Sequence, residues 1–197
     1  MKKIFNKLFS INRIDLILKN LKIGNPSILE IGVHKGDFSK ELFTNLNPKK
    51  LILVDPWIAF DDAIYKDSLY GNSHETQQKI QDQYFQDITK YFNQEILDNK
   101  IEIYRSTSDE FFLANNYKFD LIYIDGNHLF DFVKKDILNS LDFLSDNGII
   151  VLDDYHLSGW WKDGVTKAVD FFESNKVVKI IERHNIFNYH HQCILKK

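Results

Sequence analysis

Apolar residues gather in short blocks along the chain, and these blocks alternate with longer segments of helical spacing. Blocks rich in Ile, Leu and Val predict buried strands at Ser27–Ile31, Lys50–Val54, Ile101–Tyr104, Phe119–Ile124 and Gly148–Leu152. Apolar positions that recur every three or four residues predict helices at Phe38–Leu46, Glu75–Phe92, Phe130–Leu144 and Val165–Ser174, and Ser108 marks the start of another. This alternation predicts right-handed crossovers and a mostly parallel sheet.

Two β-rich blocks, Val177–Glu182 and Tyr189–Leu195, close the chain and are near enough in sequence to form a hairpin. One strand of that hairpin is then antiparallel to the rest of the sheet. The expected fold is therefore an α/β fold with a seven-stranded, mostly parallel sheet, one antiparallel strand and helices on both faces. No repeat or linker interrupts the pattern, so we expect residues 1–197 to form a single domain.

Composition narrows the class of protein. A hydrophobic share of 44%, a charged share of 27% and a formal net charge of −3 are typical of a soluble globular protein. This charge offers no basic face for nucleic acid. Cys193 is the single cysteine, so no internal disulfide forms and a reducing, cytoplasmic location is expected.

The N-terminal segment, residues 1–25, is expected to be a helical extension. Its first residues, Met1–Phe9, are basic and mildly amphipathic. They lack the apolar stretch of a signal peptide, and no run in the chain approaches the roughly 18 apolar residues of a membrane span. We expect a helix here that covers the sheet.

Acidic side chains follow two of the predicted strands. Asp125 comes directly after one strand, and Asp153 and Asp154 come directly after another. Because parallel strands end at the same edge of a sheet, these carboxylates are expected to converge at one rim. Crowded carboxylates repel one another unless a cation or proton lies between them, and Mg²⁺ is the divalent ion that this oxygen chemistry favours.

A glycine-containing turn, Glu30-Ile31-Gly32-Val33-His34-Lys35-Gly36, joins the first strand to its helix. Glycines in such a turn permit positive φ and close approach of a ligand. Asp55 ends the next strand, where a carboxylate accepts hydrogen bonds from ribose hydroxyls. His34 stands where a dinucleotide motif requires its second glycine. The turn therefore favours a nucleoside ligand without phosphates over a nicotinamide dinucleotide.

These motifs, in this order, resemble the class I S-adenosylmethionine-dependent methyltransferases with a Rossmann-like fold, particularly the macrocin-type and catechol-type metal-dependent O-methyltransferases. The resemblance implies S-adenosylmethionine as cofactor, with Asp55 on its ribose. It implies that Asp125 also contacts the cofactor, and that the methionine and ribose side is lined by Glu30, Gly32 and Gly36. Thr107 and Ser108 would lie near the adenine, although a simple helix cap explains them equally well.

The resemblance also implies a divalent metal, by default Mg²⁺, held by Asp125, Asp153 and Asp154. The alternative is that Asp125 contacts only the cofactor while one of the pair caps the next segment. Macrocin-type relatives place an acidic base where this chain has Asn127, which accepts no proton. The candidate base is therefore His128, and His156 is a second candidate. The alternative for His128 is a capping or sheet-edge histidine without a catalytic role.

The segment over residues 57–100 is longer than an ordinary connection. Its aromatic side chains suit a lid or acceptor wall, and a partner interface is the alternative. The leading functional hypothesis is metal-assisted O-methylation of a hydroxyl on a small molecule, such as a sugar or glycan unit. A metal-independent O- or N-methyltransferase and a non-catalytic cofactor-binding protein are the alternatives. No nucleic acid partner is expected, and the oligomeric state stays open.

Overall fold

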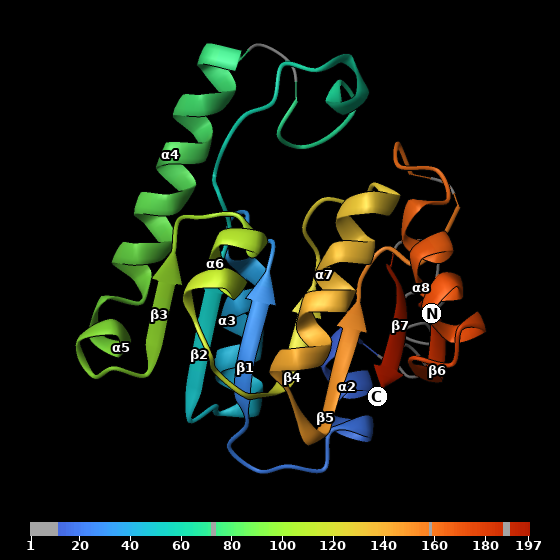
Figure 1. The fold of residues 1–197 in the computed structure, drawn as a ribbon. Coiled ribbons are helices and arrows are strands. Elements are labelled where there is room, and N and C mark those ends of the chain that lie inside the picture. Colours follow the sequence, from blue (N-terminus) through green and yellow to red (C-terminus); the bar gives the residue numbers. More distant parts are fainter. Residues whose placement is uncertain (1–11, 72–73, 158, 187–189) are drawn as a thin grey trace, which may run out of the picture.

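The computed structural model describes residues 12–71, 74–157, 159–186 and 190–197. They form a seven-stranded sheet with strand order β3-β2-β1-β4-β5-β7-β6 (Figure 1). The strands are β1 (Ser27–Ile31), β2 (Lys50–Val54), β3 (Ile101–Tyr104), β4 (Phe119–Ile124), β5 (Leu144–Leu152), β6 (Lys179–Ile186) and β7 (His190–Lys196). β7 runs antiparallel to β5 and β6, and the other neighbours are parallel. The predicted fold class is confirmed.

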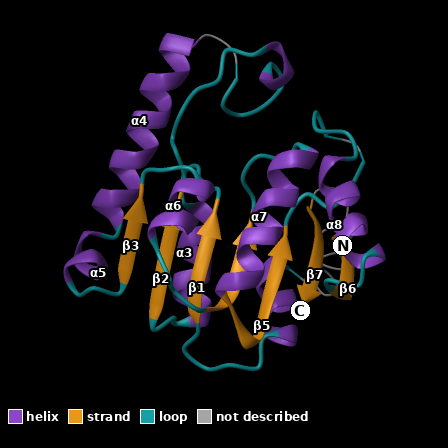
Figure 2. Ribbon diagram, in the orientation of Figure 1, coloured by secondary structure: helices purple, strands orange, loops and turns teal. Residues whose placement is uncertain are grey.

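Helices cover both faces of the sheet (Figure 2). The helices are α2 (Arg13–Asn20), α3 (Asp37–Leu46), α4 (His74–Tyr91), α5 (Asn93–Leu97), α6 (Ser108–Ala114), α7 (Phe130–Phe143) and α8 (Gly164–Ser174), with a 3₁₀ turn at Ala63–Tyr65. Side chains alternate across each strand, so Leu29 and Ile31 pack toward α6, α7 and α8. Ile28 packs on the other face, among residues of α2, α3 and α4.

The long segment after β2 divides into two parts. Its helix α4 leads to β3 and buries Ile88 in the core, so this helix is the ordinary crossover between two parallel strands. The additional part is the loop over residues 58–71, which stands beyond the carboxyl ends of the strands (Figure 1). Within this segment, the loop is the part placed to act as a lid or acceptor wall.

The start of β5 differs from the sequence pattern, and the difference has a physical cause. β5 begins at Leu144 rather than Gly148, because a register shift opposite Phe119 and Leu121 takes the Asn147-Gly148 turn signal into the strand. The N-terminal extension is a helix at Arg13–Asn20, whereas Met1–Phe9 lies outside the described residues. Cys193 is fully buried in β7, as packing predicts. Within the described part of the chain, no helix has the length and apolarity to cross a membrane.

Candidate active site

Backbone hydrogen bonds join the strand ends into one rim. The N–H of Gly32 donates to Val54, that of Asp55 to Tyr104, that of Asp125 to Ile31 and that of Asp153 to Ile124, at 2.8–3.2 Å. Each first residue after a strand is thus fixed to the last residue of its neighbour. The candidate residues lie side by side because parallel pairing continues one residue past the strands.

Gly32 and Gly36 serve packing as well as conformation. Gly32 has φ +88°, and a Cβ there would lie 2.1 Å from the carbonyl oxygen of Asp125. Gly36 has φ +72°, and a Cβ there would lie 2.1 Å from the side chain of Ile88 in α4. Gly32 lines the cavity described below, whereas Gly36 begins α3 outside that lining. The first glycine therefore shapes the site directly and the second supports it.

Asp55 holds the glycine-containing turn in place. Its Oδ2 accepts from the backbone N–H groups of Val33 and His34 at 2.9 and 3.0 Å, and its Oδ1 accepts from Trp57 N–H at 2.7 Å. His34 itself has φ 51°, so it takes the left-handed conformation that a glycine would adopt in a dinucleotide motif. Carboxylate oxygens carry further lone pairs, so the predicted contact with ribose hydroxyls is compatible with this bracing role.

Glu30 is a buried carboxyl group at the end of the cavity lined by the turn after β1. It is 1% exposed and its Oε2 accepts a 2.5 Å hydrogen bond from the Ser39 hydroxyl. Burial raises the pKa of Glu30 to about 8, although the Ser39 hydroxyl opposes the shift. A buried carboxylate of this kind is stabilised by a cation, and the ammonium group of an S-adenosylmethionine methionyl moiety suits it.

We expect Glu30→Gln to stabilise the protein at pH 9 by about 2–4 kcal/mol, relative to the wild type. Between pH 4.5 and about 8 only the unfolded chain loses the Glu30 proton, so wild-type stability falls as pH rises through this window. The amide has no proton to lose. Thermal unfolding at pH 5 and pH 9 checks this: the gain should be largest at pH 9. Asp37→Asn, at an exposed carboxylate of α3, is the control, and an equal gain at both pH values would contradict the assignment.

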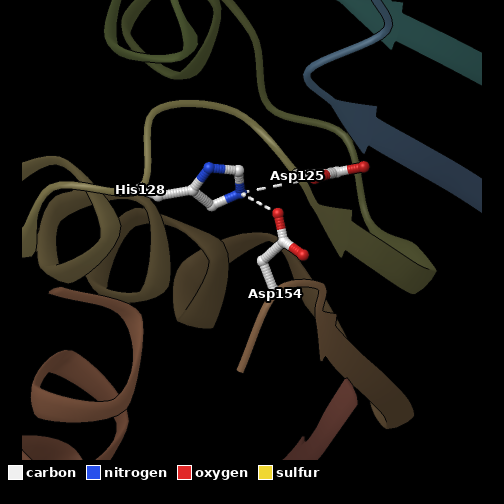
Figure 3. A group of neighbouring side chains, drawn as sticks. All are labelled: Asp125, His128 and Asp154. Atoms are coloured by element: carbon white, nitrogen blue, oxygen red, sulfur yellow. Dashed lines mark ion pairs between the residues drawn. The ribbon is translucent and has the colours of Figure 1, made fainter. Parts of the chain in front are cut away.

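Asp125, His128 and Asp154 meet at the other part of the rim (Figure 3). The Nε2 of His128 lies 3.3 Å from Asp125 Oδ1 and 3.7 Å from Asp154 Oδ2. One potential ligand atom from each residue lies within 4.8 Å of the other two. His128 Nε2 is buried and has no hydrogen-bond partner that satisfies normal geometry. His156 lies on the other side of Asp154, with its Nε2 3.5 Å from Oδ1.

The charge state of this cluster reflects crowding in a sheltered place. Burial, followed by the charge of Asp153, raises the pKa of Asp125, and burial also raises the pKa of Asp154 despite opposition from His128. Burial alone would lower the pKa of His128, but the close contact and negative charge of Asp125, together with the charge of Asp154, raise it overall. Ionisation of these crowded carboxylates therefore requires a neighbouring positive charge. The imidazolium form of His128 or a bound cation would supply it.

Asp153 makes a different set of contacts from its neighbour Asp154. Its Oδ2 accepts from Arg13 Nη1 at 2.8 Å and from the Tyr123 hydroxyl at 2.7 Å. The Tyr123 hydroxyl in turn accepts from Gln192 at 2.8 Å. The predicted trio of carboxylates is therefore divided: Asp125 and Asp154 share His128, whereas Asp153 is bound in a buried network anchored by α2.

Thr107 and Ser108 begin α6 after β3. Thr107 is the N-cap of that helix and forms a capping box with Glu110, so helix capping explains a threonine at this position. The Ser108 hydroxyl donates to Asp136 Oδ1 of α7 at 2.5 Å.

Sequence reasoning missed Asp136 and Arg13. Asp136 had a usable signal, because it is a carboxylate on the face of α7 that otherwise buries Val133, Ile137 and Leu141.

A cavity of about 560 Å³ connects these groups. This volume is in the range of small-molecule sites. Its lining includes Glu30, Gly32, Asp55, Thr107, Ser108, Asp125, His128, Asp136, Asp153 and Asp154. Aromatic side chains from the loop over residues 58–71 and from the segment after β5 complete the wall: Phe60, Tyr70, Trp160 and Trp161.

The aromatic wall is a connected cluster. Trp160 packs edge-on against Tyr65 and Tyr70, with ring centroids 5.5 and 6.0 Å apart. Asn127 donates a 2.9 Å hydrogen bond to the Tyr65 hydroxyl. Trp161 packs on His128 with centroids 4.6 Å apart. The loop over residues 58–71 is therefore fastened next to the Asp125–His128–Asp154 cluster.

Comparison with known proteins agrees with this geometry. Residues 29–155 match the family model described as a methyltransferase domain, and no curated protein matches the chain. The precorrin-6y C5,15-methyltransferase of Geobacter metallireducens is 16% identical, with TM-score 0.58, over 93% of this chain and 86% of that one. Fibrillarin of Aeropyrum pernix, with S-adenosyl-L-methionine natively bound, is 12% identical, with TM-score 0.59, over 91% and 72% of the two chains.

A third structure, the S-adenosylhomocysteine-bound Podospora anserina methyltransferase PaMTH1, is 15% identical, with TM-score 0.56, over 86% of this chain and 70% of that one. At these identities the likeness concerns the fold, and the family follows from the matched residues 29–155. That match spans more than half of the chain and contains every strand end of the cavity rim. The chain belongs to the methyltransferase domain family and is a class I S-adenosylmethionine-dependent methyltransferase.

Proposed function

We propose that this methyltransferase transfers its methyl group to a hydroxyl of a sugar or glycan unit, at a divalent-cation site made by Asp125, His128 and Asp154. The observation that carries the proposal is the convergence of two carboxylates on a buried imidazole nitrogen that lacks a normal hydrogen-bond partner. The cluster lies in the cavity wall, under the aromatic side chains of the adjoining loop. The two ends of the cavity thus offer separate places for cofactor and acceptor.

The spacing of the cluster suits a cation. Ligand distances of about 2.1 Å place neighbouring ligand atoms about 3.0–3.4 Å apart. The 3.3 and 3.7 Å separations from His128 Nε2 are close to this range. His128 takes the place of Asp153 in the ligand set expected from sequence. Asp153 Oδ2 already accepts hydrogen bonds from Arg13 and Tyr123. An imidazole ligand also favours a transition ion such as Mn²⁺ over Mg²⁺.

The cation would supply Lewis-acid chemistry, lowering the pKa of an acceptor hydroxyl that it holds. The chain's own residues position the reaction. Glu30 and Asp55 orient the cofactor at one end of the cavity, and the aromatic wall excludes water at the other. Methyl transfer requires the acceptor oxygen in line with the sulfonium methyl group, so positioning is the main catalytic contribution.

A sugar acceptor is proposed from the shape and chemistry of that wall. Phe60, Tyr70 and Trp160 present flat apolar rings, and the buried Tyr70 hydroxyl has no hydrogen-bond partner. A ring that carries hydroxyl groups matches both features, because its apolar face packs on the aromatic rings while its hydroxyls pair with Tyr70. Transfer of radiolabelled methyl to methyl glycosides and nucleotide sugars, compared with catechols, tests this class. Labelling of catechols alone would contradict it.

Titration with Mn²⁺, followed by the electron paramagnetic resonance signal of the free ion, tests the cation site directly. We expect one ion bound by the wild type and an affinity at least about tenfold lower in Asp154→Ala. Asp131→Ala is the matched control, because this exposed carboxylate of α7 lies only three residues after His128. Equal Mn²⁺ affinity in the wild type and Asp154→Ala would remove Asp154 from the site.

The second candidate is metal-independent transfer. The 3.3 Å contact between His128 and Asp125 favours it, because a carboxylate that holds an imidazole makes a general base. In that case Asp125 holds the N–H of His128 Nε2, and the other ring nitrogen accepts the proton of the acceptor hydroxyl as the methyl group moves from sulfur to oxygen. Methyl transfer at an undiminished rate in excess chelator would establish this candidate and exclude the cation.

A further inference from the structure

Asp136 is a buried carboxyl group for which the proposed function has no use. It lies on α7, is 5% exposed, and lines the cavity at the end where β3 leads into α6. The Ser108 hydroxyl donates to its Oδ1 at 2.5 Å. Burial raises the pKa of Asp136 to about 7, although the Ser108 hydrogen bond opposes the shift. A carboxylate has two oxygens with lone pairs to fill, so a further donor would stabilise it.

The position of Asp136 follows the order of the strands. The sheet runs β3-β2-β1-β4, and Asp55, the predicted ribose contact, ends β2. A nucleoside whose ribose lies at Asp55 extends its base either toward the methyl-transfer cluster after β4 or toward the β3 end. The cluster end is needed for the sulfonium and acceptor, so the base lies at the β3 end. Ser108 and Asp136 line the cavity there.

The other carboxylates at the β3 end of the cavity already have hydrogen-bond partners within the protein. Glu110 belongs to the capping box with Thr107. Asp109 accepts from Lys135 and Asn139 of α7. Neither lines the cavity, whereas Asp136 does. Asp136 is therefore the acidic group of this end that a ligand meets.

We propose that Asp136 accepts a hydrogen bond from the exocyclic amine of adenine, and so selects adenosine over other purine nucleosides in the bound cofactor. The carboxylate comes from α7, and Ser108 of α6 orients it from the side. This role rests on the family's cofactor and not on the proposed cation site or acceptor. The adenine amine donates hydrogen bonds, whereas the corresponding O6 of hypoxanthine only accepts them. A carboxylate therefore attracts the adenine amine and repels the O6 of hypoxanthine.

The experiment is isothermal titration of the full chain with S-adenosylhomocysteine and with S-inosylhomocysteine, which carries O6 in place of the amine. We expect the wild type to prefer the adenosine compound by at least about tenfold. Asp136→Asn should reduce that preference by about tenfold or more, because an amide both accepts from the amine and donates to O6. Ser108→Ala should reduce the preference in the same direction by a smaller factor.

Asp109→Asn is the control, since this neighbouring carboxylate does not line the cavity and should leave the preference unchanged. A purely structural role of Asp136 would weaken both compounds by the same factor, and that result would overturn the proposal. Equal binding of both compounds by the wild type would overturn it even if Asp136→Asn fails to fold. No binding of S-adenosylhomocysteine by the wild type would overturn the cofactor assignment together with this role.

Discussion

Gly32→Ala is expected to weaken S-adenosylhomocysteine binding by about 100-fold or more and to destabilise the fold by about 3 kcal/mol. The added Cβ would lie 2.1 Å from the carbonyl oxygen of Asp125 and 2.6 Å from the backbone nitrogen of Gly126. Both are backbone atoms, so no side-chain rotation relieves the clash. The φ of +88° adds strain for any residue with a Cβ.

The effect reaches the site because the clash separates two strand ends. Gly32 follows β1 and Asp125 follows β4, and the N–H of Asp125 donates to Ile31 at 2.8 Å. Moving the strand ends apart displaces the turn that Asp55 braces and the cluster that contains Asp125. Calorimetric binding and urea unfolding of the same variant measure the two consequences separately.

Gly24→Ala provides the matched control. A Cβ at Gly24 meets no heavy atom within 4 Å. We expect unchanged affinity and a change in stability within about 0.5 kcal/mol. Wild-type affinity in Gly32→Ala would show that the strand ends tolerate separation and that their contact does not shape the binding site.

The strands of the sheet were predictable because burial on both faces gives continuous apolar blocks. β1, β2 and β4 begin and end at the expected residues for this reason. β3 also begins and ends as expected, although this edge strand buries only Ile101 and alternates apolar and polar residues. β5 was not fully predictable, because a turn signal and a bulge within a strand use the same residues, Asn147 and Gly148. The helices α3, α4, α7 and α8 begin and end within one residue of the predicted bounds, because each carries an apolar stripe. The short helix α5 buries no residue and was not predicted.

The candidate site was predictable in position more than in detail. Parallel strands fix which residues share a rim, so the sequence alone indicates that Asp55, Asp125 and the Asp153–Asp154 pair converge. It does not indicate how two consecutive carboxylates divide their partners. Asp154 has φ 53° and contacts His128, while Asp153 contacts Arg13. That division depends on a helix about 140 residues earlier in the chain, which no local pattern encodes.

Arg13→Met is expected to destabilise the protein by about 3–5 kcal/mol, because it leaves the buried Asp153 without its cationic partner. The side chain of Asp153 is 4% exposed and that of Arg13 is 20% exposed. The Arg13 guanidinium also lies 4.1 Å from the centroid of the Phe38 ring, so its loss removes a cation–π contact too. Urea unfolding at pH 7 measures the change.

Lys19→Met is the matched control on the same helix. Lys19 forms an ion pair with Glu182 at 2.7 Å, but its side chain is 59% exposed. Solvent screens such a pair, so its loss should cost about 0–1 kcal/mol. A comparable loss of stability in the two variants would show that burial of Asp153 is not the cause.

The double variant Arg13→Met/Asp153→Asn separates the missing charge partner from the missing packing. An amide at position 153 still accepts from the Tyr123 hydroxyl, which donates at 2.7 Å in the wild type. It carries no charge that burial penalises, so the double variant should regain about half or more of the lost stability. If Asp153 instead served as a cation ligand, Asp153→Asn alone would weaken Mn²⁺ binding as strongly as Asp154→Ala. We expect it to weaken Mn²⁺ binding far less, because Arg13 and Tyr123 hold Asp153 Oδ2 outside the cluster.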